Sequence, residues 1–148
     1  MKKTLFALVA ALSIFAATTP ARAGYWETAV YAGSANQNLA TGWFYATLQL
    51  HYEANYSYID WSLIYNAWVS ASAARDNALN AYWSAPYGSY AEYYALEAYY
   101  YLAAAADNLW MVYAYGGQYP SYATDAIIYA YLGQGYLSAA AQYAALQY

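Results

Sequence analysis

A Ser-Tyr pair recurs every 32 residues along this chain, and each copy opens a long segment rich in Ala and Tyr, beginning at Ser57, Ser89 and Ser121. In the first two copies an acid follows three residues after the serine, at Asp60 and Glu92. This spacing is typical of a capping box, in which both side chains satisfy backbone N–H groups that a helix N-terminus leaves unpaired. The repeat therefore predicts three helices that begin at these serines.

The same segments carry signals for helix ends. Gly116 and Gly117 follow the middle segment, and prolines stand at Pro86 and Pro120, shortly before the second and third copies. Glycine favours the left-handed conformation that ends a helix, and proline does not continue one. Long helices joined by short turns pack as antiparallel neighbours. We therefore predict an all-α fold, an up-down-up-down four-helix bundle formed by residues 24–148 as one domain.

The first and last helices are less regular than the middle two. Residues 26–53 should form the first helix, with an apolar stripe at Leu39, Trp43, Ala46 and Leu50. Gly33 weakens helical propensity, so we expect a break or irregularity near it, with a second capping box from Ser34 to Gln37 that could restart the helix. The last helix, from residue 122 to about residue 147, contains Gly133 and Gly135, where we expect it to bend or to pack closely.

The first 23 residues have the pattern of a cleaved signal peptide. Lys2 and Lys3 precede an apolar run over residues 5–17, and Ala21-Arg22-Ala23 forms an A-x-A cleavage site. The mature chain would begin at Gly24, and the protein would be exported to a bacterial periplasm or beyond. A retained membrane anchor is the alternative.

Cleavage would leave a strongly acidic chain. It removes three of the four basic residues and none of the eight acids, so the formal net charge falls from −4 to −7. Such a chain offers no basic surface for nucleic acid or anionic lipid head groups. The sequence contains no cysteine, which excludes disulfides, thiolate metal sites and a cysteine nucleophile.

Arg75, the one strong base left, falls within the apolar arc of the second helix, which we assign to Trp61, Ile64, Trp68, Ala71, Ala78 and Tyr82. An unpaired buried charge is costly, so the arginine needs a partner there. Antiparallel folding brings it level with Glu97 and Asn36. We predict an inner polar layer of Arg75, Glu97 and Asn36, with Gln142 as a further candidate. A register-fixing ion pair, or an arginine that reaches to the edge of the bundle, is the simpler interpretation, and a ligand-binding site is the alternative.

Few residues are candidates for chemistry. His51 is the only histidine, and with Met111 it forms a weak candidate for non-covalent haem ligation. A charge partner at a helix C-terminus is the simpler interpretation of His51. A di-iron site needs two histidines, and no nucleophile elbow or phosphate-binding loop is present. We therefore expect neither a cofactor nor enzymatic activity.

The 24 tyrosines and six tryptophans exceed what the core of such a bundle holds. Consecutive helical residues point about 100° apart, so the adjacent tyrosines Tyr93, Tyr94, Tyr99, Tyr100 and Tyr101 cannot all face inward. We interpret these five as an interaction surface for self-association or for docking on another exported protein. The alternatives are a cleft for a small aromatic, apolar or sugar ligand, and surface tyrosines without a role.

Residues 126–148 carry no charge and are long enough to span a membrane. They are rich in Tyr, Gln, Gly and Ala, and no Lys or Arg flanks them, so we do not expect a membrane span.

Overall fold

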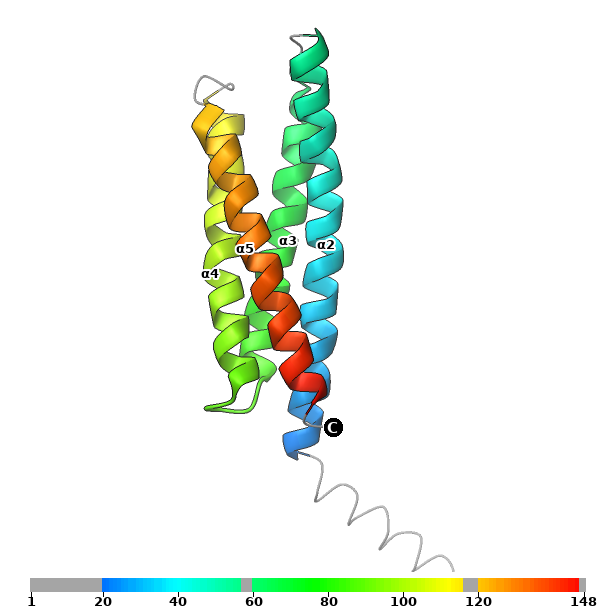
Figure 1. The fold of residues 1–148 in the computed structure, drawn as a ribbon, viewed down its shortest axis with the longest axis vertical. Helices are drawn as coiled ribbons and strands as arrows, with labels where there is room; N and C mark the ends of the chain where they lie inside the picture. The colour runs from blue at the N-terminus through cyan, green and yellow to red at the C-terminus, as the bar shows by residue number, and fades with distance from the viewer. Residues whose placement is uncertain (1–19, 57–59, 116–119, 147–148) are drawn as a thin grey trace, which may run out of the picture.

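The computed structural model describes residues 20–56, 60–115 and 120–146, and it is all-helical over these ranges (Figure 1). The four helices are α2 (Pro20–Tyr56), α3 (Trp61–Ser84), α4 (Tyr90–Ala114) and α5 (Pro120–Ala145). Their long axes run roughly along the longest dimension of the molecule, and the helices pack against one another side by side. The predicted bundle of four helices is thus confirmed at this level.

The helices form a ring in which each contacts two neighbours. Helices consecutive in the sequence pack together, and α5 closes the ring against α2. The diagonal pairs α2–α4 and α3–α5 hardly touch. This arrangement leaves four grooves between neighbouring helices on the outside of the bundle, and two of them hold clusters of aromatic rings.

The core is made mainly of alanine. Its central cluster holds ten alanines and only three leucines, Leu39, Leu102 and Leu137. The buried positions recur at alternating intervals of four and three residues, as at Ala67, Ala71, Ala74, Ala78 and Ala81 in α3. An average spacing of 3.5 residues keeps one narrow seam of each helix against its neighbours.

This seam differs from the predicted apolar faces. In α2, Leu39 is buried as expected, but Gly42 and Gln49 complete the line, and Trp43 is only partly buried. In α3, Trp61 is exposed and Trp68 half-buried, while small alanines face the core. Because the seam residues are small, neighbouring backbones come too close for indole rings to fit between them. The large rings lie beside the seam instead.

Helix starts are partly as predicted. In α4, the Ser89 hydroxyl accepts a hydrogen bond of 3.1 Å from the N–H of Glu92, which confirms the cap. The Glu92 carboxylate accepts from the N–H of Gly88 at 2.6 Å, one residue earlier than a capping box requires. Gly88 has a φ of 75°, a left-handed conformation that glycine adopts without strain.

The start of α3 is capped by Asp60, and Ser57 lies outside the described residues. The Asp60 carboxylate accepts from the N–H of Ser62 at 2.9 Å. Hydrogen bonding from the Ser62 side chain is the main reason that the pKa of Asp60 is lowered. The acid predicted as the second half of a capping box is therefore itself the cap.

Two further corrections concern α2 and α5. α2 continues through Gly33 and Ser34 without a break, because Gly33 is exposed and a helix tolerates one such residue at a small cost. α5 begins at Pro120, not at Ser121, since proline suits the first turn of a helix. The predicted stop at Gly116 and Gly117 lies outside the described residues, and α4 ends at Ala114.

None of the described helices combines the length and the hydropathy needed to cross a membrane. The predicted signal peptide falls almost entirely on residues 1–19, which lie outside the described part of the chain. α2 begins at Pro20, so the backbone is helical across the predicted cleavage site.

Candidate functional site

Six tyrosines line the groove between α4 and α5 and form what we call the tyrosine ladder: Tyr90, Tyr94 and Tyr101 from α4, and Tyr129, Tyr136 and Tyr143 from α5. Neighbouring ring centroids along it are 5.2 to 6.4 Å apart. Two pairs are stacked, Tyr94 on Tyr143 at 5.2 Å and Tyr101 on Tyr136 at 5.2 Å. Each ladder tyrosine directly precedes a seam residue in the sequence. The rings therefore lie just outside the alanine core.

The ladder is electrostatically coupled. Partial burial, followed by the charge and hydrogen bonding of Tyr143, raises the pKa of Tyr94. The charge on an ionised Tyr101, partial burial and the carboxylate of Glu97 raise the pKa of Tyr136. Glu97 lies three residues after Tyr94 and four before Tyr101, on the same face of α4. Each of these two phenols therefore resists ionisation in the folded chain.

Five rings form a second group in the groove between α3 and α4, which we call the aromatic patch: Trp61, Tyr65 and Trp68 from α3, and Trp110 and Tyr113 from α4. The closest pair is Trp68 and Trp110, with centroids 5.2 Å apart. Four of the five side chains are more than a third exposed, and Trp68 is half-buried. The patch is thus a continuous aromatic surface held by ring-to-ring contacts.

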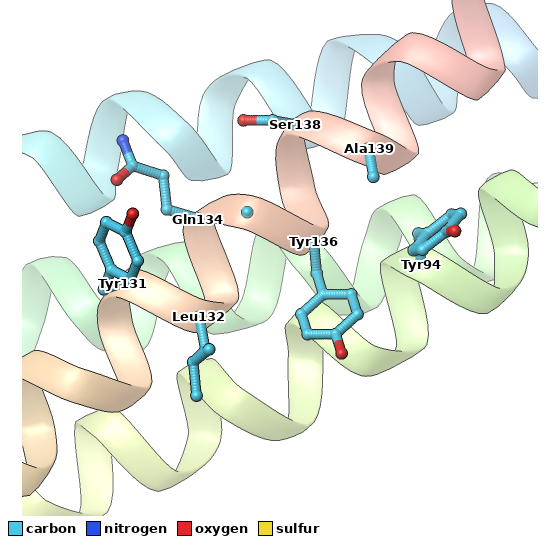
Figure 2. A pocket seen from close by; sticks show the side chains of 8 residues that line it. Tyr94, Tyr131, Leu132, Gln134, Tyr136, Ser138 and Ala139 are labelled. Carbon is cyan, nitrogen blue, oxygen red and sulfur yellow. The ribbon is translucent and has the colours of Figure 1, made fainter.

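A shallow pocket of about 520 Å³ lies over α5, around Gly135 (Figure 2). The missing side chain at this exposed glycine leaves the hollow, and nothing would meet a Cβ added there. Figure 2 shows Gln134 and Tyr131 on one side of the helix and Tyr136 descending toward α4 and Tyr94. The pocket therefore offers two kinds of contact, aromatic rings and an amide.

The five tyrosines predicted as one interaction surface occupy different environments. Tyr93 and Tyr100 are exposed, while Tyr99 packs against the core. Tyr94 and Tyr101 belong to the ladder, where they contact α5 of the same chain. The role of these residues in binding stays a prediction, but the structure does not bring the five side chains together on one face.

The predicted inner polar layer is replaced by a local ion pair. Arg75 contacts the carboxylate of the adjacent Asp76, with an N–O distance of 2.8 Å, and its side chain is 32% exposed. Glu97 lies beside the ladder tyrosines instead. The alanine seam leaves no room for a guanidinium group, so Arg75 reaches the edge of the bundle. Asn36 is half-buried, and its Oδ1 atom has no hydrogen-bond partner.

The remaining candidates add little. The side chain of His51 lies outside the described residues, and Met111 is half-buried near the end of α4. Gln142, the further candidate for the polar layer, is exposed on α5. Within the described ranges, no group of three or more His, Asp or Glu side chains is placed to hold a metal ion.

Sequence reasoning missed the aromatic patch because it assigned Trp61 and Trp68 to the core face by hydrophobicity. The available signal was the alanine line at intervals of four and three residues, which marks the seam and leaves the tryptophans beside it. Comparison of the chain with family models, with curated proteins and with solved structures found no match.

Proposed function

We propose that this chain is an exported, non-enzymatic interaction protein, and that its aromatic patch binds a second copy of the chain. The observation that carries the proposal is the patch itself, five touching rings of which four are more than a third exposed. Monomeric soluble proteins rarely expose contiguous apolar surface of this kind, and such surface marks sites of association.

The chemistry of the patch suits binding. Trp and Tyr, together with Arg, are the residues most enriched among those that dominate binding energy at interfaces. Contacts such as that between Trp68 and Trp110 already restrict the rings, so little side-chain freedom remains to be lost on association.

Charge repulsion between two copies is smallest at this surface. None of the five patch residues is charged, whereas the chain would carry a formal net charge of −7 after the predicted cleavage. Two acidic copies therefore approach most easily where neither presents a charge. Docking on another exported protein is the alternative outcome of the test below.

The test is the oligomeric state of the purified protein, measured by light scattering after size exclusion over a range of protein concentrations. We expect the wild-type mass to rise with concentration and the Trp110→Gln and Trp61→Gln variants to stay monomeric. The matched control is Trp83→Gln, because Trp83 is 73% exposed but lies outside the patch on the last turn of α3. The control should associate as the wild type does.

A wild-type protein that stays monomeric at every concentration argues against self-association. Capture of an exported protein by the wild type and by Trp83→Gln, but not by Trp110→Gln, would then identify the patch as a docking site for that protein. Equal loss of association in Trp83→Gln and Trp110→Gln would show that the patch has no special role.

The proposal includes two features of the mature chain. We infer that cleavage after Ala23 exposes Gly24 as the new N-terminus and that the four helices connect in up-down-up-down order. The A-x-A pattern of residues 21–23 supports the first inference. Gly24 itself packs closely on α3, because a Cβ added there would lie 2.7 Å from the carbonyl oxygen of Ser84. The glycine thus belongs to the packed bundle. The intact mass of the exported protein tests the cleavage site.

A second candidate function is the binding of a small ligand in the pocket around Gly135. The combination of Tyr131 and Tyr136 rings with the Gln134 amide and the Ser138 hydroxyl suits a sugar, which presents both apolar faces and hydroxyl groups. Calorimetric titration with simple sugars tests it. A Gly135→Leu variant, which fills the hollow, should lose any heat of binding that the wild type shows.

A further inference from the structure

The stacked pair Tyr101 and Tyr136 joins two helices through two phenol rings. The centroids lie 5.2 Å apart and the ring planes are 9° from parallel. The Tyr101 phenol also acts on the phenol of Tyr136, whose pKa it raises. Of the two stacked pairs of the ladder, this one has the ring planes closer to parallel, so the two phenols face each other across the groove.

The surroundings of the pair favour loss of an electron. The carboxylate of Glu97 acts electrostatically on Tyr136, and a nearby negative charge stabilises the positive charge that develops when a phenol loses an electron. Tyr129 and Tyr94 continue the ladder on either side within 6.4 Å, so an oxidised site elsewhere on the ladder has neighbours to draw an electron from.

We propose that Tyr101 and Tyr136 are a modification site, at which a peroxidase-class one-electron oxidant forms a covalent dityrosine bond between α4 and α5. Each phenol gives one electron to the oxidant and one proton to water. The two phenoxyl radicals then join through a carbon–carbon bond between ortho carbons, and the hydrogens on those carbons move to the oxygens and restore both phenols. Two electrons and two protons leave, and they reduce one hydrogen peroxide to two waters.

The cross-link would stabilise this chain, which cannot form a disulfide. The sequence has no cysteine, so no disulfide can fasten its helices in an oxidising compartment. A bond between residues 101 and 136 closes a loop in the unfolded chain and so reduces its conformational freedom, as a disulfide does. We therefore expect the oxidised protein to unfold at a higher temperature than the unmodified one. The inference does not depend on self-association, since both rings belong to one copy.

The experiment treats dilute purified protein with hydrogen peroxide and a haem peroxidase, and in a parallel sample with a photosensitised ruthenium tris-bipyridyl complex and persulfate. We expect dityrosine fluorescence in protein that keeps the mass of a single chain less two hydrogen atoms. Proteolysis and mass spectrometry should show a linked peptide pair that contains Tyr101 and Tyr136.

The variants separate this pair from the other tyrosines. Tyr136→Phe keeps a ring in the stack but cannot form the phenoxyl radical, so the single-chain cross-link should fall to background. The matched control Tyr131→Phe lies on the same helix, is exposed and is not stacked, and it should cross-link as the wild type does. Tyr101→Phe provides a second variant if circular dichroism shows that Tyr136→Phe does not fold.

Three results would overturn the inference. One is single-chain cross-linking that persists in both Tyr136→Phe and Tyr101→Phe. The second is a linked peptide pair that contains other tyrosines in place of these two. The third is dityrosine that forms only between separate chains under dilute conditions.

Discussion

Gly133 shows at the scale of one residue how closely α4 and α5 approach. It is a buried seam position of α5, and a Cβ added there would lie 2.9 Å from both Cγ and Cδ2 of Leu102. Leu102 is fully buried in the core cluster, so it has little space to move away. Gly135, only two residues further on, faces open space.

These two glycines predict opposite effects of the same substitution. Gly133→Ala should lower the free energy of unfolding by about 1–3 kcal/mol, because the extra methyl group overpacks the seam. Gly135→Ala should raise it by about 0.5–1 kcal/mol, because alanine restricts the unfolded chain and favours helix at an exposed site. Urea unfolding followed by circular dichroism measures both. A stabilised Gly133→Ala variant would contradict the close approach of α5 to Leu102.

At the scale of the element, α4 carries two kinds of surface along parallel lines. Its seam is alanine and leucine at positions such as Ala95, Ala98 and Leu102, and the tyrosine ladder runs directly beside it at Tyr94 and Tyr101. Small seam residues let the backbones come close, and this closeness brings tyrosines of neighbouring helices into ring contact. The same geometry produces the aromatic patch between α3 and α4.

The ladder predicts a loss of stability in alkaline solution. The pKa values of Tyr94 and Tyr136 are raised above the ordinary value of 10.0, so the folded chain holds these protons more tightly than the unfolded chain. The stabilisation is complete below about pH 10, where both states are protonated, and it is lost as the pH rises through the raised folded pKa. We expect the urea midpoint to fall above pH 10.

The measurement is the urea midpoint by far-ultraviolet circular dichroism at pH 8 and at several values above pH 10. The double variant Tyr94→Phe/Tyr136→Phe should show a shallower decline than the wild type. Tyr87→Phe is the control, because Tyr87 is 98% exposed and outside the ladder, and it should decline as the wild type does. Equal declines in all three proteins would remove the ladder as the cause.

At the scale of the whole molecule, net charge opposes self-association and the aromatic patch favours it. The full sequence has four basic and eight acidic side chains, a formal net charge of −4, so separate copies repel one another in solution. The aromatic patch offers uncharged surface for contact. Association through the patch must overcome this repulsion, which depends on the salt concentration.

Salt should therefore strengthen self-association. The distance over which charges act falls from about 30 Å at 0.01 M ionic strength to about 8 Å at 0.15 M, so added salt screens the repulsion between copies. We expect the dissociation constant of the dimer, measured by sedimentation velocity, to decrease between these conditions. A dissociation constant that increases with salt would indicate that attraction between opposite charges, and not the patch, holds the copies together.

The sequence by itself determined the helical class, the cap at Ser89 and the placement of many aromatic side chains outside the core. These features follow from local chemistry, because capping hydrogen bonds and helical periodicity act within a few residues. The number of tyrosines also exceeded what four narrow seams can bury.

Only the tertiary structure decided which side chains form the seam and which partners they meet. Hydrophobicity favoured Trp61 and Trp68 for the core, yet the close approach of the backbones admits alanine there and places the indoles in an outer groove. The same lack of space turned Arg75 toward Asp76 and left Glu97 beside the tyrosine ladder. The distance between helices is a property of all four packed together, and no single segment specifies it.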